Sequence, residues 1–219
     1  MDHTERKEHG MVALGVFCIG IGGEHHHARP GPANLNTLRR ALQLGWVRVL
    51  PTIFGNALGL AVGGLACAFG AGALVLASDL AWALLQGLGV VYLLWLGGKL
   101  LITHETLLVD GANDPAAPRA APLFREAFLL AVTNPKALLF YLALLPQSLD
   151  PTMGAGWGLA LQAVTLVLTY CALSILSLST YAALASALRN RVMTQARYTA
   201  FRRGSGIVIL AFALKLLVG

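Results

Sequence analysis

Long apolar stretches alternate with short polar connections along most of this chain. Uninterrupted apolar runs such as residues 137–145 lack the alternation of a barrel strand. Because a backbone in lipid must satisfy its own hydrogen bonds, such runs are expected to be helices. At about 20 apolar residues per crossing, the pattern predicts about six transmembrane helices. The expected spans cover approximately residues 11–29, 46–77, 80–102, 124–149, 157–184 and 205–218, with a loop at 103–122.

Composition supports the same class of protein. Of the 219 residues, 57% are hydrophobic and 12% are charged, and the mean hydropathy is +0.68. Soluble domains carry about 25% charged residues, and a soluble fold of this size cannot hide so much apolar surface. We therefore predict one all-α polytopic domain over residues 1–219, with the lipid bilayer as its solvent. Cys18, Cys67 and Cys171 are isolated and form no CxxC motif, so neither a redox nor a zinc site is indicated.

The basic residues mark membrane topology. Most of the 16 Lys and Arg residues gather between expected spans one and two, three and four, and five and six. They are Arg39, Arg40, Arg48, Lys99, Arg119, Arg125, Arg189, Arg191, Arg197, Arg202 and Arg203. The connections near Ser78 and at 150–156 contain no Lys or Arg. This alternation supports six spans independently of hydropathy, places both termini outside the cell membrane, and argues against a nucleic-acid partner.

The N-terminal segment is unusual. An apolar stretch at residues 11–23 is followed by Glu24 and three consecutive histidines. No small-x-small cleavage site precedes them, so we expect the segment to be retained. His25, His26 and His27 would point about 100° apart on a helix and cannot converge on one ion unaided. The run is either a metal-binding or pH-sensing element or a neutral or damaged segment.

Glycines recur at four-residue spacing in the second expected span. Gly55, Gly59 and Gly63 would share one helix face and allow a second backbone to approach closely. The alternative is that glycine is simply frequent in membrane helices. Such faces permit a homodimer without demonstrating one.

Two places put helix breakers and polar atoms inside apolar segments. The residues concerned are Pro30, Gly31, Pro32 and Asn34 in the first place and Asn134, Pro135 and Lys136 in the second. Proline removes a backbone donor, so the freed carbonyls must lie where protein or water can satisfy them. One break falls in the first expected span and the other in the fourth. This placement indicates two three-helix inverted repeats, with a solute site where the repeats meet.

The second break carries the more informative side chains. Lys136 lies within an expected span, where an ammonium costs several kcal/mol, about +2.5 to +3.5 on insertion scales. It either faces a cavity or a substrate carboxylate, or extends along its stem to the membrane interface. Asn134 either binds the solute or caps the broken helix. Glu126 is expected at the membrane interface.

Three short motifs carry a family resemblance. They are PGP with NL at residues 30–35, GVVYLLWLG at 89–97, and NPKA at 134–137 with LPQ at 145–147. In this order and spacing they resemble the LysE/RhtB amino-acid exporter superfamily, which includes homoserine, threonine and lysine exporters. The likeness covers roughly residues 30–150.

This resemblance implies a secondary transporter of the bacterial cytoplasmic (inner) membrane. It would export amino acids or related small metabolites, be driven by the proton gradient, and have neither a cofactor nor an enzymatic activity. Both termini would then be periplasmic, and the residues of the two helix breaks would form the translocation site. Ala127, Ala131 and Ser148 depart from the family pattern and leave the substrate open.

Two other classes of function compete with this interpretation. A divalent metal exporter is the main alternative, because of the three histidines at 25–27. A membrane enzyme is the other, but the spans lack paired carboxylates, a nucleophile with its base, or a dithiol.

Overall fold

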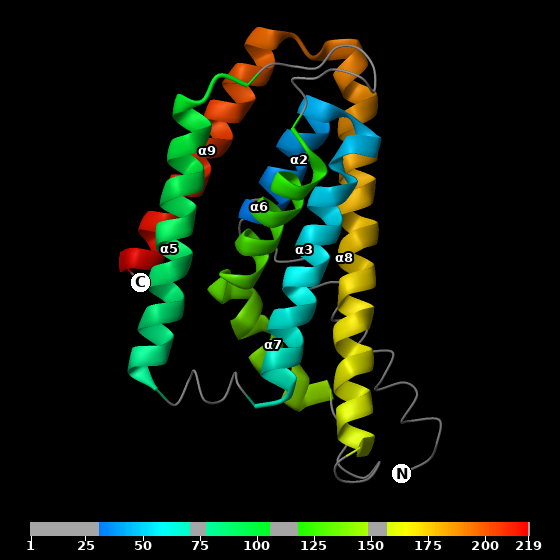
Figure 1. The fold of residues 1–219 in the computed structure, drawn as a ribbon, viewed down its shortest axis with the longest axis vertical. Coiled ribbons are helices and arrows are strands. Elements are labelled where there is room, and N and C mark those ends of the chain that lie inside the picture. The colour runs from blue at the N-terminus through cyan, green and yellow to red at the C-terminus, as the bar shows by residue number, and fades with distance from the viewer. Residues whose placement is uncertain (1–30, 71–77, 106–117, 149–156, 219) are drawn as a thin grey trace.

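The computed structural model of the chain describes residues 31–70, 78–105, 118–148 and 157–218 (Figure 1). Within these ranges the regular structure is entirely helical, which confirms the all-α class. The helices are α2 (Pro32–Leu44), α3 (Trp46–Ala68), α5 (Asp79–Ile102), α6 (Ala120–Val132), α7 (Pro135–Ser148), α8 (Trp157–Val192) and α9 (Gln195–Val218). The segments Trp46–Ala68, Asp79–Ile102 and Trp157–Arg189 are each long and apolar enough to cross a membrane.

The helix α2 corrects one expectation. Its residues were expected to be a helix break followed by a charged connection, yet they form a continuous helix. Pro32 occupies the first turn, where its missing N–H is not needed. The helix ends at Gly45, whose φ of 83° favours glycine and whose N–H bonds to Ala41 O at 2.9 Å. The expected first span, 11–29, lies outside the described residues.

The expected fourth span is divided as its sequence indicates. The helix α6 ends at Val132 and α7 begins at Pro135. Asn134 separates them, and its carbonyl accepts hydrogen bonds from Ala137 N at 3.1 Å and Leu138 N at 3.4 Å. The helix α9 begins at Gln195, ten residues before the expected sixth span at residue 205.

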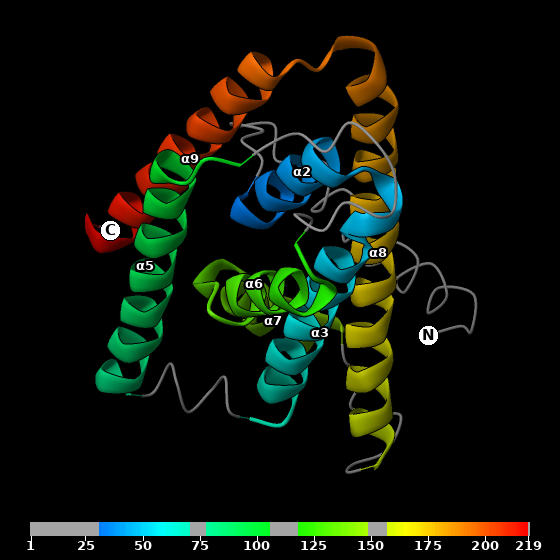
Figure 2. The same ribbon diagram turned by 45° about the horizontal axis from the view of Figure 1, so that its top comes forward.

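The helices pair in an antiparallel manner. On α3 and α8, Ile53 shares a core cluster with Leu178, while Leu60 shares another with Val167. Figures 1 and 2 show α5 and α9 side by side at one edge of the molecule, with α2, α6 and α7 between them and α8. Residue numbers rise along α3 while those of its contacts on α8 fall, so the two helices run in opposite directions.

The pair α5 and α9 meets through glycines. A Cβ on Gly97 would lie 3.1 Å from Gly206 O, and one on Gly206 would lie 3.0 Å from Gly97 O. Further along, the side chain of Gln86 donates to Leu216 O. The low-numbered end of α5 therefore lies against the high-numbered end of α9, which makes this pair antiparallel too.

Close contact with α6 explains part of the glycine pattern on α3. A Cβ on Gly55 would lie 2.3 Å from Phe124 O, and one on Gly59 would lie 2.8 Å from Phe128 O. Both positions therefore require glycine, as close helix packing predicts. The prediction is wrong for Gly63, where an added Cβ meets no atom within 4 Å.

Outward faces of the long helices are apolar. The exposed large side chains include Phe54, Leu58 and Val62 on α3, Leu84, Leu88 and Val91 on α5, and Leu161, Leu168 and Leu176 on α8. Exposed rows of this kind suit lipid contact and are rare on soluble monomers.

Candidate functional site

Three connections rich in basic residues meet at one end of the bundle. Leu44 at the end of α2 packs on Leu123 at the start of α6. Gln195 Nε2 at the start of α9 donates to Glu105 O, just beyond α5, at 3.0 Å. We call this region the charged end: the C-terminal ends of α2, α5 and α8 and the N-terminal ends of α3, α6 and α9.

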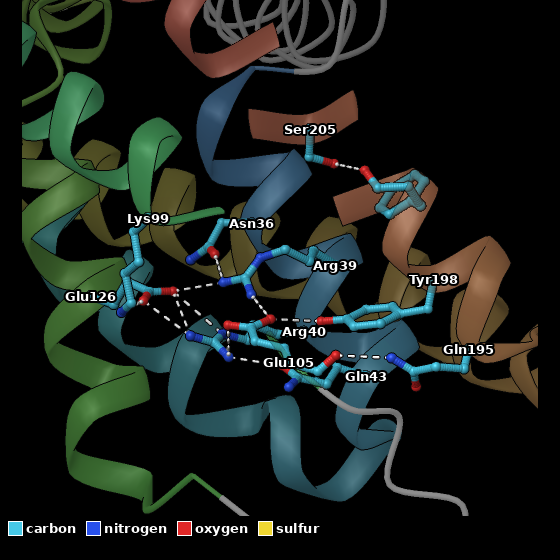
Figure 3. Close-up of polar contacts among 11 residues, drawn as sticks. Asn36, Arg39, Arg40, Gln43, Lys99, Glu105, Glu126, Gln195, Tyr198 and Ser205 are labelled. Carbon is cyan, nitrogen blue, oxygen red and sulfur yellow. Dashed lines mark hydrogen bonds and ion pairs between the residues drawn. The ribbon is translucent and has the colours of Figure 1, made fainter. Parts of the chain in front are cut away.

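Glu126 lies at the centre of a buried ion-pair network at the charged end (Figure 3). Its carboxylate accepts from Arg39 Nη2 at 2.9 Å, Arg40 Nη2 at 3.0 Å and Lys99 Nζ at 3.2 Å. Glu126 is only 6% exposed, and Arg39, which was expected in a connection between spans, is fully buried within α2. The network joins α2, α5 and α6.

A second carboxylate extends this network to α9. Glu105 accepts from Arg39 Nη1 at 2.6 Å and from the Tyr198 hydroxyl at 2.7 Å. Burial raises the pKa of Glu105, but Arg39 and Arg40 lower it further, so the net pKa lies below its usual value. Glu105 is therefore ionised near neutral pH. The network then holds three cations against two carboxylates, an excess of one positive charge.

The charged end also contains a cavity of about 580 Å³ between α2, α5 and α6. Charged residues on its wall are Arg40, Lys99, Glu105, Arg125 and Glu126, and aromatic ones are Tyr92 and Trp95. Lys99 Nζ lies 4.9 Å from the centre of the Trp95 ring, which is a cation–π distance. Mixed apolar walls with a few fixed charges, at this volume, suit a small zwitterionic solute.

The residues predicted from the helix breaks lie elsewhere. Gly31 precedes α2 as its N-cap, Pro32 is half-buried, and Asn34 is exposed. Asn134 is half-buried and Pro135 is buried. None of these five lines the cavity at the charged end. Of the remaining two predicted positions, Pro30 and the side chain of Lys136 lie outside the described parts of the structure.

The structure nevertheless brings the two breaks to a similar level. The helices α2 and α6 are antiparallel, because Leu44 packs near Leu123 while Leu35 shares a core cluster with Leu130. The start of α2 and the end of α6 therefore adjoin the same cluster. A Cβ on Gly89 of α5 would lie 2.5 Å from Thr133 O, so this glycine lets α5 pack directly on the second break.

Sequence reasoning missed the network. Arg39 and Arg40 were assigned to topology, and Glu126 was assigned to the interface. One signal was available for Glu126, since an acidic residue inside an expected span is by default a functional candidate. No comparable signal marked the arginines, whose neighbours are polar.

The described residues contain no group of three or more His, Cys, Asp or Glu side chains that could hold a metal ion. The three histidines at 25–27, which motivate a metal exporter, lie outside the described residues.

A helix divided at Asn134, antiparallel helix pairs and a polar cavity define a helical membrane protein of the kind that moves small solutes. The chain matches the LysE type translocator family over residues 26–219 and belongs to that family. The resemblance noted from the motifs is thereby confirmed, as is the expectation that the chain is a transporter rather than an enzyme.

Several bacterial proteins are similar to the chain. A leucine efflux protein of Klebsiella pneumoniae is 32% identical over 152 residues, covering 68% of this chain and 71% of that protein. One of Salmonella choleraesuis is 33% identical over 158 residues with the same coverage. An uncharacterised membrane protein of Vibrio cholerae is 36% identical over 123 residues, and the match spans 59% of its length and 56% of this chain. No solved structure matches the chain.

Proposed function

We propose that the protein exports an amino acid, leucine or a close analogue, across the bacterial inner membrane as a proton-coupled secondary transporter. Family membership and the two leucine efflux relatives support an amino acid as the solute. The positive-inside rule places the charged end in the cytoplasm and both termini in the periplasm. The transporter needs no cofactor, and it can form a homodimer.

The observation that carries this proposal is the antiparallel pairing of corresponding helices. In a transporter built from two inverted repeats, the first, second and third helices of each half run opposite to their counterparts. Here α2 pairs with α6, α3 with α8 and α5 with α9, each in an antiparallel manner. The chain is thus consistent with two halves, one ending in α5 and the other beginning with α6.

The two helix breaks then form the centre of the translocation path. Corresponding helices carry them, and both adjoin the cluster that contains Leu35 and Leu130. Helix ends at such a level offer unpaired backbone groups to a polar solute. The positions proposed for this role are Pro30, Gly31, Pro32, Asn34, Asn134, Pro135 and Lys136.

The cavity at the charged end has the position of an entrance. An exporter must take its solute from the cytoplasm, and the basic residues place this cavity on that side. Lys99 and Arg40 supply cations for a carboxylate, Glu126 supplies an anion for an ammonium, and Trp95 supplies an apolar wall. A zwitterion with an aliphatic side chain matches this combination of groups.

Export is tested with Lys136→Ala. Cells loaded with labelled leucine should lose it faster when they express the wild type, and a protonophore should abolish the difference. Lys136→Ala should remove export while the protein remains in the membrane. The matched control is Lys215→Ala, which changes an exposed lysine of α9 and should export normally.

Normal export by a well-expressed Lys136→Ala variant would contradict the proposed site. Wild-type cells that retain leucine and every other amino acid would contradict the function. Resistance to nickel, cobalt or zinc that requires the three histidines would instead favour the metal-export alternative.

A further inference from the structure

Arg202 of α9 is a buried arginine whose guanidinium is only partly supplied with acceptors by the described residues. It is 1% exposed, and within the described part of the chain its Nε and Nη1 atoms have no hydrogen-bond acceptor. A buried guanidinium normally pairs with a carboxylate, because an uncompensated charge in a protein interior is strongly destabilising. A group of this kind therefore requires an explanation.

No acidic side chain of the described residues serves Arg202. These residues include only three acids. Glu105 and Glu126 bind Arg39, Arg40 and Lys99. Asp79 begins α5 and is exposed, far along that helix from the charged end. Arg202 therefore adds to the excess of cations over carboxylates around the start of α9.

A second buried donor lies at the same level on α2. Asn36 is 1% exposed, and its Nδ2 has no acceptor among the described residues. Its Oδ1 accepts from Arg39 Nη2 at 2.9 Å, and the same Nη2 lies 2.9 Å from Glu126 Oε1. Asn36 therefore contacts Arg39 of the ion-pair network, part of which borders the cavity.

Arg202 lies on the face of α9 that packs against α2. Tyr198 shares a core cluster with Ala41, and Ile209 shares one with Leu35. Arg202 and Ser205 continue the same buried stripe of α9 between these two points. In Figure 3, Asn36 lies at a height between Tyr198 and Ser205, the residues that flank Arg202 in this stripe.

This level lies between the cavity and the helix breaks. At 1.5 Å per residue, Asn36 is about 12 Å from the C-terminal end of α2 and about 6 Å from Pro32. Arg202 is similarly about 10 Å from the start of α9. A solute that moves from the charged end to the breaks passes this level after Arg39.

We propose that Arg202 and Asn36 bind the carboxylate of the exported solute between the cavity and the helix breaks. The inference rests on the proposed function, since it assigns a residue pair to its substrate. Nε–H and Nη1–H point from different edges of the planar guanidinium, so a carboxylate oxygen can accept from one of them and is attracted by the positive charge. Asn36 Nδ2 supplies a second donor. The unpartnered atoms of Arg202 and Asn36 are donors, so a ligand of this pair must be an acceptor.

Binding is measured by thermal unfolding of the full-length protein in detergent, with L-leucine, L-leucinamide or chloride added. L-leucine should raise the unfolding temperature of the wild type. L-leucinamide, which has the same side chain and no carboxylate, should not, and chloride at equal concentration should not. Arg202→Met should weaken leucine binding about 10- to 100-fold, the range for a lost charge-assisted hydrogen bond.

The neighbouring Arg203 provides the matched control. Arg203 is exposed on the same helix, so Arg203→Met should bind leucine as the wild type does. Without ligand, Arg202→Met should unfold at a higher temperature than the wild type, because it removes an unpaired buried charge. If Arg202→Met fails to fold, Arg202→Lys keeps the charge but replaces the planar guanidinium with a single ammonium group, and should still bind leucine more weakly.

The inference would be overturned if leucinamide or chloride stabilised the wild type as much as leucine does. It would also be overturned if leucine stabilised both Arg202 variants as much as the wild type. A wild type that leucine does not stabilise would overturn it as well. Leucine loss from cells is measured separately. If the wild type exports leucine but the Arg202 variants bind it as tightly as the wild type does, only this inference fails. If the wild type binds leucine through its carboxylate but does not export it, only the proposed function fails.

Discussion

Two sets of buried charge lie along α2, and they differ in their partners. At the charged end, Glu126 and Glu105 form ion pairs with Arg39, Arg40 and Lys99, so that each cation has a carboxylate within 3.4 Å. About one turn deeper, Arg202 is equally buried, yet its Nε and Nη1 have no acceptor within the described residues. Both sets lie beside α2 in the protein interior.

The difference separates stability from function. A paired network contributes to holding its helices together once it is formed, because removing one partner leaves the others buried and uncompensated. An unpaired buried charge only destabilises the folded protein, and such groups concentrate where a ligand supplies the missing partner. Substitutions in the first set should therefore lower stability, while Arg202→Met should raise it.

The largest effect is expected from Glu126→Ala. The change leaves Arg39, Arg40 and Lys99 around an apolar methyl group, and breaking a buried ion pair costs about 3–5 kcal/mol. The free energy of unfolding is measured by denaturant titration in detergent. Asp79→Ala is the control: it removes an exposed first-turn carboxylate of α5 and should cost only about 0.3–1 kcal/mol. Equal losses in the two variants would mean that the network does not stabilise the bundle.

A smaller effect is expected from Gly97→Ala, which disturbs the contact that positions α9 and hence Arg202. The new Cβ would lie 2.7 Å from Leu210 Cγ and 3.1 Å from Gly206 O. Overpacking of this kind costs about 1–3 kcal/mol. The control is the next residue, since Gly98→Ala meets no atom within 4 Å and should stabilise α5 by up to about 1 kcal/mol.

Opposite signs in these two variants, read from the same denaturant titration, would support the antiparallel packing of α5 on α9. A loss of similar size in Gly98→Ala would show that the contact runs over a different face of α5.

Much of the fold could be predicted from sequence because its determinants are local. Apolar length indicates α3, α5 and α8, and the breakers at Asn134 and Pro135 mark the division between α6 and α7. The helix α2 was missed because its turns mix charged and polar residues. Such a segment resembles a connection unless its partners across the bundle are known.

The candidate site was less predictable because it depends on pairing between distant residues. Arg39 and Glu126 are 87 positions apart, and nothing in the sequence relates them. Glu126 could have been flagged as an acid inside an expected span. Arg202 could not, since its neighbour Arg203 has the same chemistry and only packing shows that one is buried and the other exposed.

The smallest effect is expected from Glu105→Gln, and this effect should disappear at low pH. The pKa of Glu105 lies below its ordinary value of 4.5 in the folded protein. The ionised carboxylate therefore stabilises the folded state above about pH 4.5, and this stabilisation is lost as pH falls through the lower, folded pKa. Glu105→Gln keeps an acceptor for Tyr198 but cannot ionise, so it should lower the unfolding temperature at pH 7 by a few degrees.

Below the folded pKa the two proteins should converge, because the wild-type carboxyl is then neutral as well. The unfolding temperatures of both are measured in one detergent from pH 7 down to about pH 3. Gln195→Ala is the control, because the Gln195 side chain donates to the backbone oxygen of Glu105 and carries no charge. Its difference from the wild type should not change with pH. A gap between Glu105→Gln and wild type that keeps the same size from pH 7 to about pH 3 would show that Glu105 acts through its shape rather than its charge, and the network would then end at Glu126.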